Sequence, residues 1–222
     1  MATARFSTEE NKEFVISLTL IAGYLIIQVL ANLTVSKQTP LYKNFSIPVG
    51  SLLWAVTFTW IDLINDHLGK HKARLLVVAS IAVNILTTLW LSFYIWVPGS
   101  PEWSPEKQSS IEFVFGGYWR IYLASILTTF VCENLDINIF HYFKYKRPQF
   151  PRWARSMASN TVSAPLDAVL FVSLAFVGTM PLTVLFSIIV TSALYKLAVA
   201  YLSVPLLYLV KARKQSSTTE IK

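Results

Sequence analysis

Long apolar stretches constrain the fold of this chain more than any other feature. About six of them follow one another, each roughly 18–25 residues long, and their apolar residues run on without the alternation of a half-buried strand. At a rise of about 1.5 Å per residue, each stretch is long enough to cross a bilayer as a helix. The sequence therefore predicts an all-α, polytopic membrane protein with six transmembrane helices. We expect these helices at residues 14–33, 48–67, 75–97, 118–143, 156–177 and 181–210.

The composition and the placement of charge agree with this class. Charged residues make up 14% of the sequence, whereas an ordinary soluble domain has about 25%. The formal charge of +7 could indicate a nucleic-acid partner, but Lys and Arg lie mostly in short segments between the apolar stretches. That placement is typical of the loops of a membrane protein. The expected partner is therefore the lipid bilayer and not a nucleic acid.

The basic residues also predict the orientation, because Lys and Arg concentrate on the cytoplasmic side of membrane proteins. We expect one six-helix transmembrane domain at 14–210, with an N-terminal tail at 1–13 and a C-terminal tail at 211–222. With six spans, both tails share a side with the segments 68–74 and 142–155. That side holds fourteen Lys and Arg residues and the opposite side holds four. Both termini are predicted to be cytoplasmic.

The fourth apolar stretch carries acidic residues in its middle. A carboxylate at the centre of a bilayer costs about 2.5–3.5 kcal/mol on insertion scales, so such groups normally face a polar cavity. Glu133 and Asp136 are three residues apart and therefore share a helix face, which Phe140 continues. Two adjacent acids offer acceptors to a donor-rich or cationic ligand. This face is predicted to form a binding site inside the membrane.

Other spans add polar residues at comparable depths. The predicted intramembrane acids are Asp62, Glu133, Asp136 and Asp167, and the single clear cation is Lys196. The interior therefore carries an excess of negative charge if all four acids ionise. Such a site draws in a cation or keeps some carboxyl groups protonated. The remaining candidate site residues are Asn32 in the first span, Asp62 and Asn65 in the second, and Asn160 and Asp167 in the fifth.

A structural role is the alternative to a binding role for these residues. Lys196 could pair with one carboxylate and only hold the bundle together, because a buried charge needs a partner. One lysine cannot neutralise four acids, so the alternative does not account for all of them. Three spans in each half, with Asp62 and Asp167 in the second and the fifth, would also fit a 3+3 inverted repeat.

Signatures of enzymes and metal sites are missing from the sequence. It contains no HExxH motif, no Gly-x-Ser-x-Gly elbow and no P-loop. His67, His71 and His141 are scattered without the spacing of paired ligands, so no metal site and no cofactor are predicted. The single cysteine, Cys132, excludes an internal disulfide. The protein is not expected to be an enzyme.

A further set of residues recurs in order along nearly the whole chain. The set comprises Asn32, Pro48-Val49-Gly50, Asp62 with Asn65, Gly69, Ala73-Arg74, Arg120, Ser125, Leu135-Asp136, Ile139-Phe140, Leu166-Asp167, Lys196 and Pro205. In order and spacing it resembles the queuosine precursor transporter family, also called the VUT family. These are six-span proteins linked to the uptake of 7-deazaguanine bases. Many members have an amide at the position of Glu133, so the carboxylate here is a departure.

The resemblance implies import of preQ0, preQ1 or queuine across a bacterial or archaeal cell (inner) membrane. The guanine-like edge of these bases presents an N1–H and a 2-amino group side by side, and one carboxylate can accept from both. We therefore expect Asp136 or Glu133 to read this edge. Asp62 and Asp167 would complete the pocket, Lys196 would balance the charge, and an aromatic side chain would cover the ring. A homodimer, and coupling to a proton or a sodium ion, are compatible with this pattern.

Two other functions fit a six-span protein. One is the substrate-binding subunit of an energy-coupling-factor importer for vitamins or nucleobases. Such subunits usually carry Ala-x-x-x-Ala in the first span, and Ala22 and Ala31 do not have this spacing. The other is a membrane enzyme or scaffold that transports nothing. A stand-alone carrier is the favoured interpretation.

Overall fold

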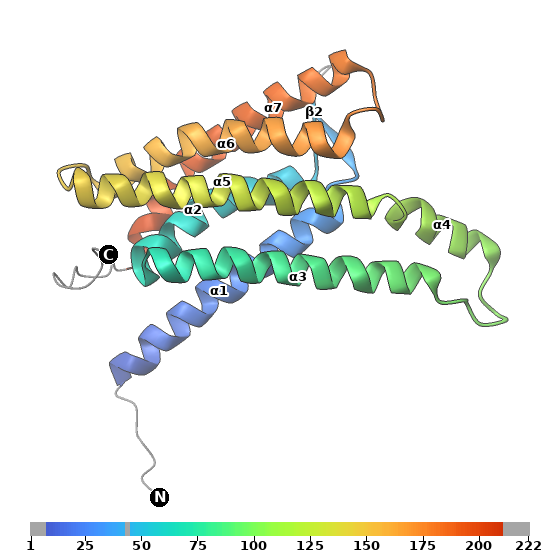
Figure 1. Ribbon diagram of the computed structural model, residues 1–222, viewed down its shortest axis with the longest axis horizontal. Helices are drawn as coiled ribbons and strands as arrows, with labels where there is room; N and C mark the ends of the chain where they lie inside the picture. The colour runs from blue at the N-terminus through green and yellow to red at the C-terminus, as the bar shows by residue number, and fades with distance from the viewer. Residues whose placement is uncertain (1–7, 43–44, 211–222) are drawn as a thin grey trace, which may run out of the picture.

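The computed structural model describes residues 8–42 and 45–210 as a bundle of long helices with one small hairpin (Figure 1). The predicted C-terminal tail, 211–222, and residues 1–7 of the predicted N-terminal tail lie outside the described residues. The elements are α1 (Thr8–Thr34), β1 (Gln38–Tyr42), β2 (Phe45–Pro48), α2 (Gly50–Leu68), α3 (Lys70–Trp96), α4 (Pro105–Phe115), α5 (Tyr118–Lys146), α6 (Arg152–Phe176), α7 (Leu182–Leu202) and the 3₁₀ helix η1 (Val204–Tyr208).

Each of the six predicted spans forms a helix, and the all-α, polytopic class is confirmed. Within the described residues, five helical stretches are long and apolar enough to cross a membrane: Asn11–Thr34, Lys70–Trp96, Pro105–Lys146, Arg152–Phe176 and Leu182–Tyr208. The remaining predicted span, at 48–67, corresponds to α2, which does not meet that criterion. The six-span prediction is therefore approximately supported, with five spans that meet the criterion and α2 as the sixth helix.

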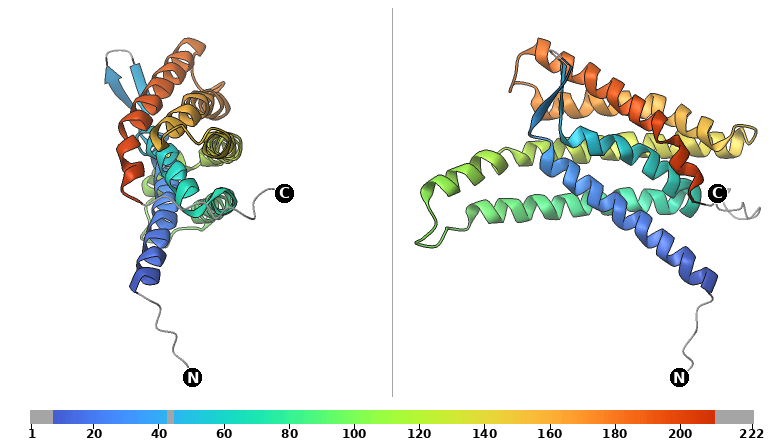
Figure 2. Two further views of the ribbon diagram at one scale, coloured as in Figure 1. Left: turned by 90° about the vertical axis from the view of Figure 1, so that its left-hand side faces the viewer. Right: turned by 180° about the vertical axis from the view of Figure 1, so that it is seen from behind.

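The position of α2 explains how it can carry buried polar residues. Thirteen of its 19 residues are buried, among them Asp62, Asn65 and Asp66. It packs against α1, α3, α5, α6 and α7, and it occupies the middle of the bundle in the end-on view (Figure 2, left). A helix enclosed by other helices needs little apolar surface for lipid. The outer helix α3 shows the opposite pattern, with Leu86, Trp90 and Trp96 at least 65% exposed.

Two connections differ from the sequence prediction. The link after the first span contains an antiparallel hairpin, in which Gln38 pairs with Pro48 and Thr39 with Ile47. The polar link at 98–117 contains α4, whose first turn is stabilised by the Ser104 hydroxyl accepting from the Lys107 backbone N–H at 3.4 Å. The last predicted span is also shorter. α7 ends at Leu202, and Pro205, which cannot continue an α-helix, lies in the following 3₁₀ turn.

A close approach of α1 and α2 sets the faces that these helices present to the interior. A Cβ atom on Gly50 would lie 2.0 Å from the Ala31 carbonyl oxygen, so only glycine fits at the start of α2. Further along the crossing, a Cβ atom on Gly23 would lie 2.7 Å from the Trp60 ring. The Trp60 indole also donates to the Leu20 carbonyl at 2.9 Å. These contacts hold α1 at a fixed rotation.

Polar contacts join the helices at both ends of the bundle. At the end formed by the α2–α3 and α5–α6 connections, Asp66 forms ion pairs with Lys144 at 2.9 Å and with Arg152 at 2.7 Å. At the other end, which we call the hairpin end, the Tyr118 hydroxyl donates to the Leu33 carbonyl at 2.5 Å and the Arg120 Nε donates to the Leu174 carbonyl at 2.9 Å. The helices between these two layers enclose the site.

Candidate functional site

All nine residues predicted for the site are buried. None has more than 2% of its surface exposed, although they come from five helices. They are Asn32 on α1, Asp62 and Asn65 on α2, Glu133, Asp136 and Phe140 on α5, Asn160 and Asp167 on α6, and Lys196 on α7. Their side chains divide into three polar groups, each with different partners.

The first group joins α2, α5 and α6 around two acids. The Asp62 and Asp136 carboxyl groups lie within hydrogen-bonding reach of each other. Asp62 Oδ2 accepts from the Ser156 hydroxyl and, at 3.2 Å, from Asn160 Nδ2. Asp136 Oδ1 accepts from the Ser163 hydroxyl at 2.7 Å. Every group that donates to this pair is neutral. We call Asp62, Asp136, Ser156, Asn160 and Ser163 the acid-pair cluster.

The acid-pair cluster also contains acceptors without donors. No N–H or O–H group of the described residues donates to Asp136 Oδ2 or to Asn160 Oδ1, and both atoms are inaccessible to solvent. Buried polar atoms are nearly always hydrogen-bonded, and unpaired ones often mark a place for water or a ligand. The cluster therefore has spare capacity to accept hydrogen bonds.

The second group is an ion pair between α6 and α7. The Lys196 ammonium group contacts Asp167 Oδ2, and the Trp54 indole donates to Asp167 Oδ1 at 3.1 Å. Lys196 thus neutralises one of the four acids, as expected if it pairs with a single carboxylate to hold the bundle together. Asp62, Glu133 and Asp136 have no basic partner within the described chain.

The third group fixes Glu133 against α1. The Tyr24 hydroxyl donates to Glu133 Oε2, and Gln28 Nε2 donates to Glu133 Oε1 at 2.9 Å. Each carboxylate oxygen therefore has its own donor. Glu133 still lies close enough to Asp136 and Asp167 for their charges to interact, and Cys132 lies in the same region. The four acids converge on one part of the interior.

Other predicted residues have structural partners. Asn65 Nδ2 donates to the Ile137 carbonyl at 3.3 Å and so links α2 to α5. Asn32 Nδ2 donates to Asn84 Oδ1 at 2.7 Å, which joins α1 to α3. Phe140 is wholly buried one helical turn after Asp136. These residues surround the acids and hold the helices around them.

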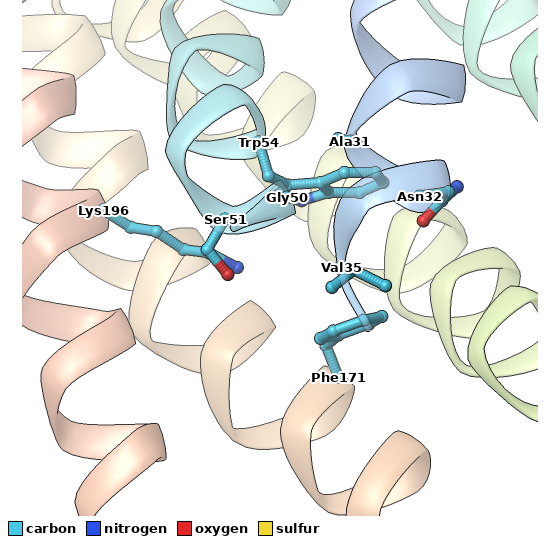
Figure 3. Close-up of a pocket in the computed structure, with 8 residues that line it drawn as sticks. All are labelled: Ala31, Asn32, Val35, Gly50, Ser51, Trp54, Phe171 and Lys196. Carbon is cyan, nitrogen blue, oxygen red and sulfur yellow. The ribbon is translucent and has the colours of Figure 1, made fainter. Parts of the chain in front are cut away.

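A small cavity borders the ion pair (Figure 3). Its volume is about 10 Å³, which is room for about one water molecule. In Figure 3 the rings of Trp54 and Phe171 lie above and below it, and Lys196 reaches in from α7. A ligand larger than a water molecule does not fit in this cavity. The lining residues are Ala31, Asn32, Val35, Gly50, Ser51, Trp54, Phe171 and Lys196.

Comparisons with known proteins assign the chain to a family. The family described as "Putative vitamin uptake transporter" matches residues 48–210, which hold all four acids and Lys196. The chain belongs to this vitamin uptake transporter family. A protein of Bacillus subtilis (strain 168) named "Probable queuosine precursor transporter" is 29% identical over 188 residues, or 82% of this chain and 79% of that protein. No solved structure gives a significant match.

Membership in the vitamin uptake transporter family confirms the resemblance drawn from the sequence. It makes the protein a multi-pass membrane transporter for a small molecule, and it argues against an enzyme. Among the described residues, no group of three or more His, Cys, Asp or Glu side chains could hold a metal ion.

Sequence reasoning missed several residues of this transporter's interior. Tyr24 and Gln28 are four residues apart, and Asn32 is four further on, so all three lie on one face of α1. That spacing could have identified Tyr24 and Gln28 as partners for an acid. Trp54 and Phe171 gave no such signal, because an aromatic residue in an apolar helix is usually a packing residue.

A row of polar side chains leads from the acids toward the hairpin end. Tyr122, Ser125, Thr128 and Thr129 continue the α5 face that carries Glu133 and Asp136. Each is buried, and its hydroxyl has no hydrogen-bond partner among the described residues. Ser192 on α7 is buried and unpartnered in the same way. These hydroxyls therefore form a buried polar row between the acids and the hairpin end.

Proposed function

We propose that the protein imports a 7-deazaguanine base, namely preQ0, preQ1 or queuine, and binds it at the acid-pair cluster. The observation that carries this proposal is the difference between the acids. Glu133 and Asp167 each have both oxygens occupied by protein donors, whereas Asp136 Oδ2 has no donor. Of these three carboxylates, Asp136 has the fewest protein donors and an oxygen without one, which suits a donor-rich ligand.

The hydrogen-bond donors of the base edge match the unpaired acceptor Asp136 Oδ2. A guanine-like edge presents N1–H and a 2-amino N–H side by side, and a carboxylate can accept about four hydrogen bonds in all. Asp136 accepts one from Ser163, which leaves sites for both donors of the base. A site built on such bonds discriminates strongly against analogues that lack the donors. The unpaired Asn160 Oδ1 offers a further acceptor.

The other groups have supporting roles in this proposal. The base would enter from the hairpin end along the unpartnered hydroxyls of α5. Asp62 and Asp167 complete the pocket, and Lys196 balances the charge of Asp167. The excess of negative charge favours the cationic aminomethyl base preQ1. The bundle 14–210 is one transmembrane domain of a bacterial or archaeal inner membrane, with both termini in the cytoplasm.

Growth of cells that cannot make the precursor tests this function. The cells express the protein and receive preQ0, preQ1 or queuine separately at low external concentration, and queuosine in tRNA is measured. We expect at least one base to restore queuosine above the level in cells without the protein. The exposed variant Glu106→Gln on α4 should behave like the wild type. If no base restores queuosine in cells that hold the protein in their membrane, the proposal is wrong.

A further inference from the structure

The acid pair poses an electrostatic problem that the protein alone does not solve. Asp62 and Asp136 are both 0% exposed, and their carboxyl groups are within hydrogen-bonding reach. Two carboxylates at such a distance, away from water, cannot both be ionised, because their repulsion is not screened. A hydrogen bond between them also needs a proton, since an ionised carboxylate is only an acceptor.

No basic side chain of the described residues is available to neutralise the pair. Lys196 is bound to Asp167, and Lys144 and Arg152 are bound to Asp66. Arg74 on α3 donates to the Asn138 amide oxygen at 2.6 Å. The remaining titratable groups near the pair are Glu133 and Cys132 on α5, and neither is a cation. The α6 side chains that donate to the pair are Ser156, Ser159, Asn160 and Ser163, and all four are neutral.

The count of hydrogen-bond donors also indicates that a proton is missing from the cluster. Ser156 and Asn160 donate to Asp62 Oδ2, and the longer contact from Ser159 to Asp62 Oδ1 is 3.4 Å. Asp136 Oδ2 and the buried Asn160 Oδ1 receive no donor from the described residues. The cluster is therefore short of hydrogen atoms as well as of positive charge. One proton supplies both.

We propose that the Asp62–Asp136 pair binds one transported proton, held in the hydrogen bond between the two carboxyl groups, and that this proton crosses the membrane together with the base. The coupling rests on the proposed function. With this proton in place, Asp136 accepts from Ser163 and shares the proton with Asp62, and its remaining acceptor sites face the donors of the base. Without the proton, the repulsion of two negative charges would separate the carboxyl groups. Protonation therefore prepares the base site.

The geometry favours a proton over a sodium ion. A metal cation between two carboxyl groups holds them apart at its own coordination distance and takes several further oxygen ligands. A direct hydrogen bond between the two carboxyl groups needs a proton and does not need a metal ion. A sodium-driven transporter would need a different arrangement of these side chains.

Purified protein in sealed liposomes tests the coupling, with preQ0 as the substrate because it is uncharged. Equal potassium on both sides with valinomycin sets the membrane potential to zero. We expect a pH gradient of one unit, acidic outside, to accumulate preQ0 up to about tenfold, as one proton per base requires. The interior should acidify as the base enters. A sodium gradient at equal pH should produce no accumulation.

Exchange of labelled preQ0 against unlabelled preQ0, with no gradient, separates the two proposals. One outcome is that exchange occurs while the pH gradient drives no accumulation of the base and entry of the base does not acidify the interior. In that case the proton inference is wrong and the proposed function stands. Accumulation driven by sodium would likewise overturn the inference. If no exchange occurs, the proposed function fails, and with it the coupling.

Variants locate the proton. Accumulation of preQ0 by Asp62→Asn should no longer respond to the pH gradient, whereas the exposed Glu106→Gln should keep the response. Infrared spectra of the wild type should show the carbonyl band of a protonated carboxyl group that shifts in heavy water, and Asp62→Asn should lose it. This readout holds even if that variant transports nothing. A band that disappears only in Glu133→Gln would place the proton at Glu133 and overturn the assignment.

Discussion

The variant Asp136→Asn should lower uptake of the base by about 100-fold or more while the protein still folds and inserts. Asparagine has the shape of aspartate and can still accept from Ser163, so the helices keep their contact. It offers one acceptor oxygen in place of two, and its amide group faces the donors of the base with another donor. A site whose polar groups fail to match is penalised strongly. Uptake of labelled base into cells with matched protein levels measures the effect.

A matched control lies two residues away on the same helix. Asn134 donates to the Phe130 carbonyl of its own helix at 2.8 Å and does not contact the acid-pair cluster. Asn134→Ser should therefore keep uptake within about twofold of the wild type. Normal uptake by Asp136→Asn would remove this residue from the site. Equal loss in both variants would show that α5 is merely sensitive to substitution.

Removal of Lys196 should give the largest loss of stability. The change Lys196→Met leaves the Asp167 carboxylate buried without a counter-charge, which costs about 3–5 kcal/mol. The double variant Lys196→Met with Asp167→Asn removes both charges and keeps an acceptor for the Trp54 indole, so it should recover most of that loss. Thermal unfolding of the three proteins in detergent checks both expectations.

Uptake by the double variant then separates the two roles of the ion pair. Recovered stability with recovered uptake means that the pair only holds α6 against α7. Recovered stability without uptake means that Lys196 or Asp167 also acts in transport. A single variant Lys196→Met as stable as the wild type would contradict the ion pair itself.

The sequence predicted the helices well because each long apolar stretch needs the same solution in lipid. It did not predict the hairpin at Gln38–Pro48 or the helix α4, because short polar segments carry no such constraint. Nor could it predict that α2 lies at the centre. The polarity of a helix indicates that some face avoids lipid, but the identity of its neighbours depends on how all the helices pack.

The acids show the same limit at the level of side chains. Their depth and spacing predicted that they would gather in the interior. Which acid meets Lys196 depends on helix rotations of a fraction of a turn, so the pairing with Asp167 could not be read from spacing. Asn160, Ser163 and Asp167 share one face of α6, yet the first two contact the acid pair and the third contacts Lys196.

The most direct test of the central claim compares two binding affinities, measured by calorimetry with the purified protein in lipid nanodiscs. One is the affinity for preQ0, and the other is the affinity for the same base without its 2-amino group. If the Asp136 carboxylate reads the donor edge, the analogue should bind about 100-fold more weakly or not at all, and Asp136→Asn should remove most of this difference. Equal binding of the two bases to the wild type would contradict recognition by a buried carboxylate.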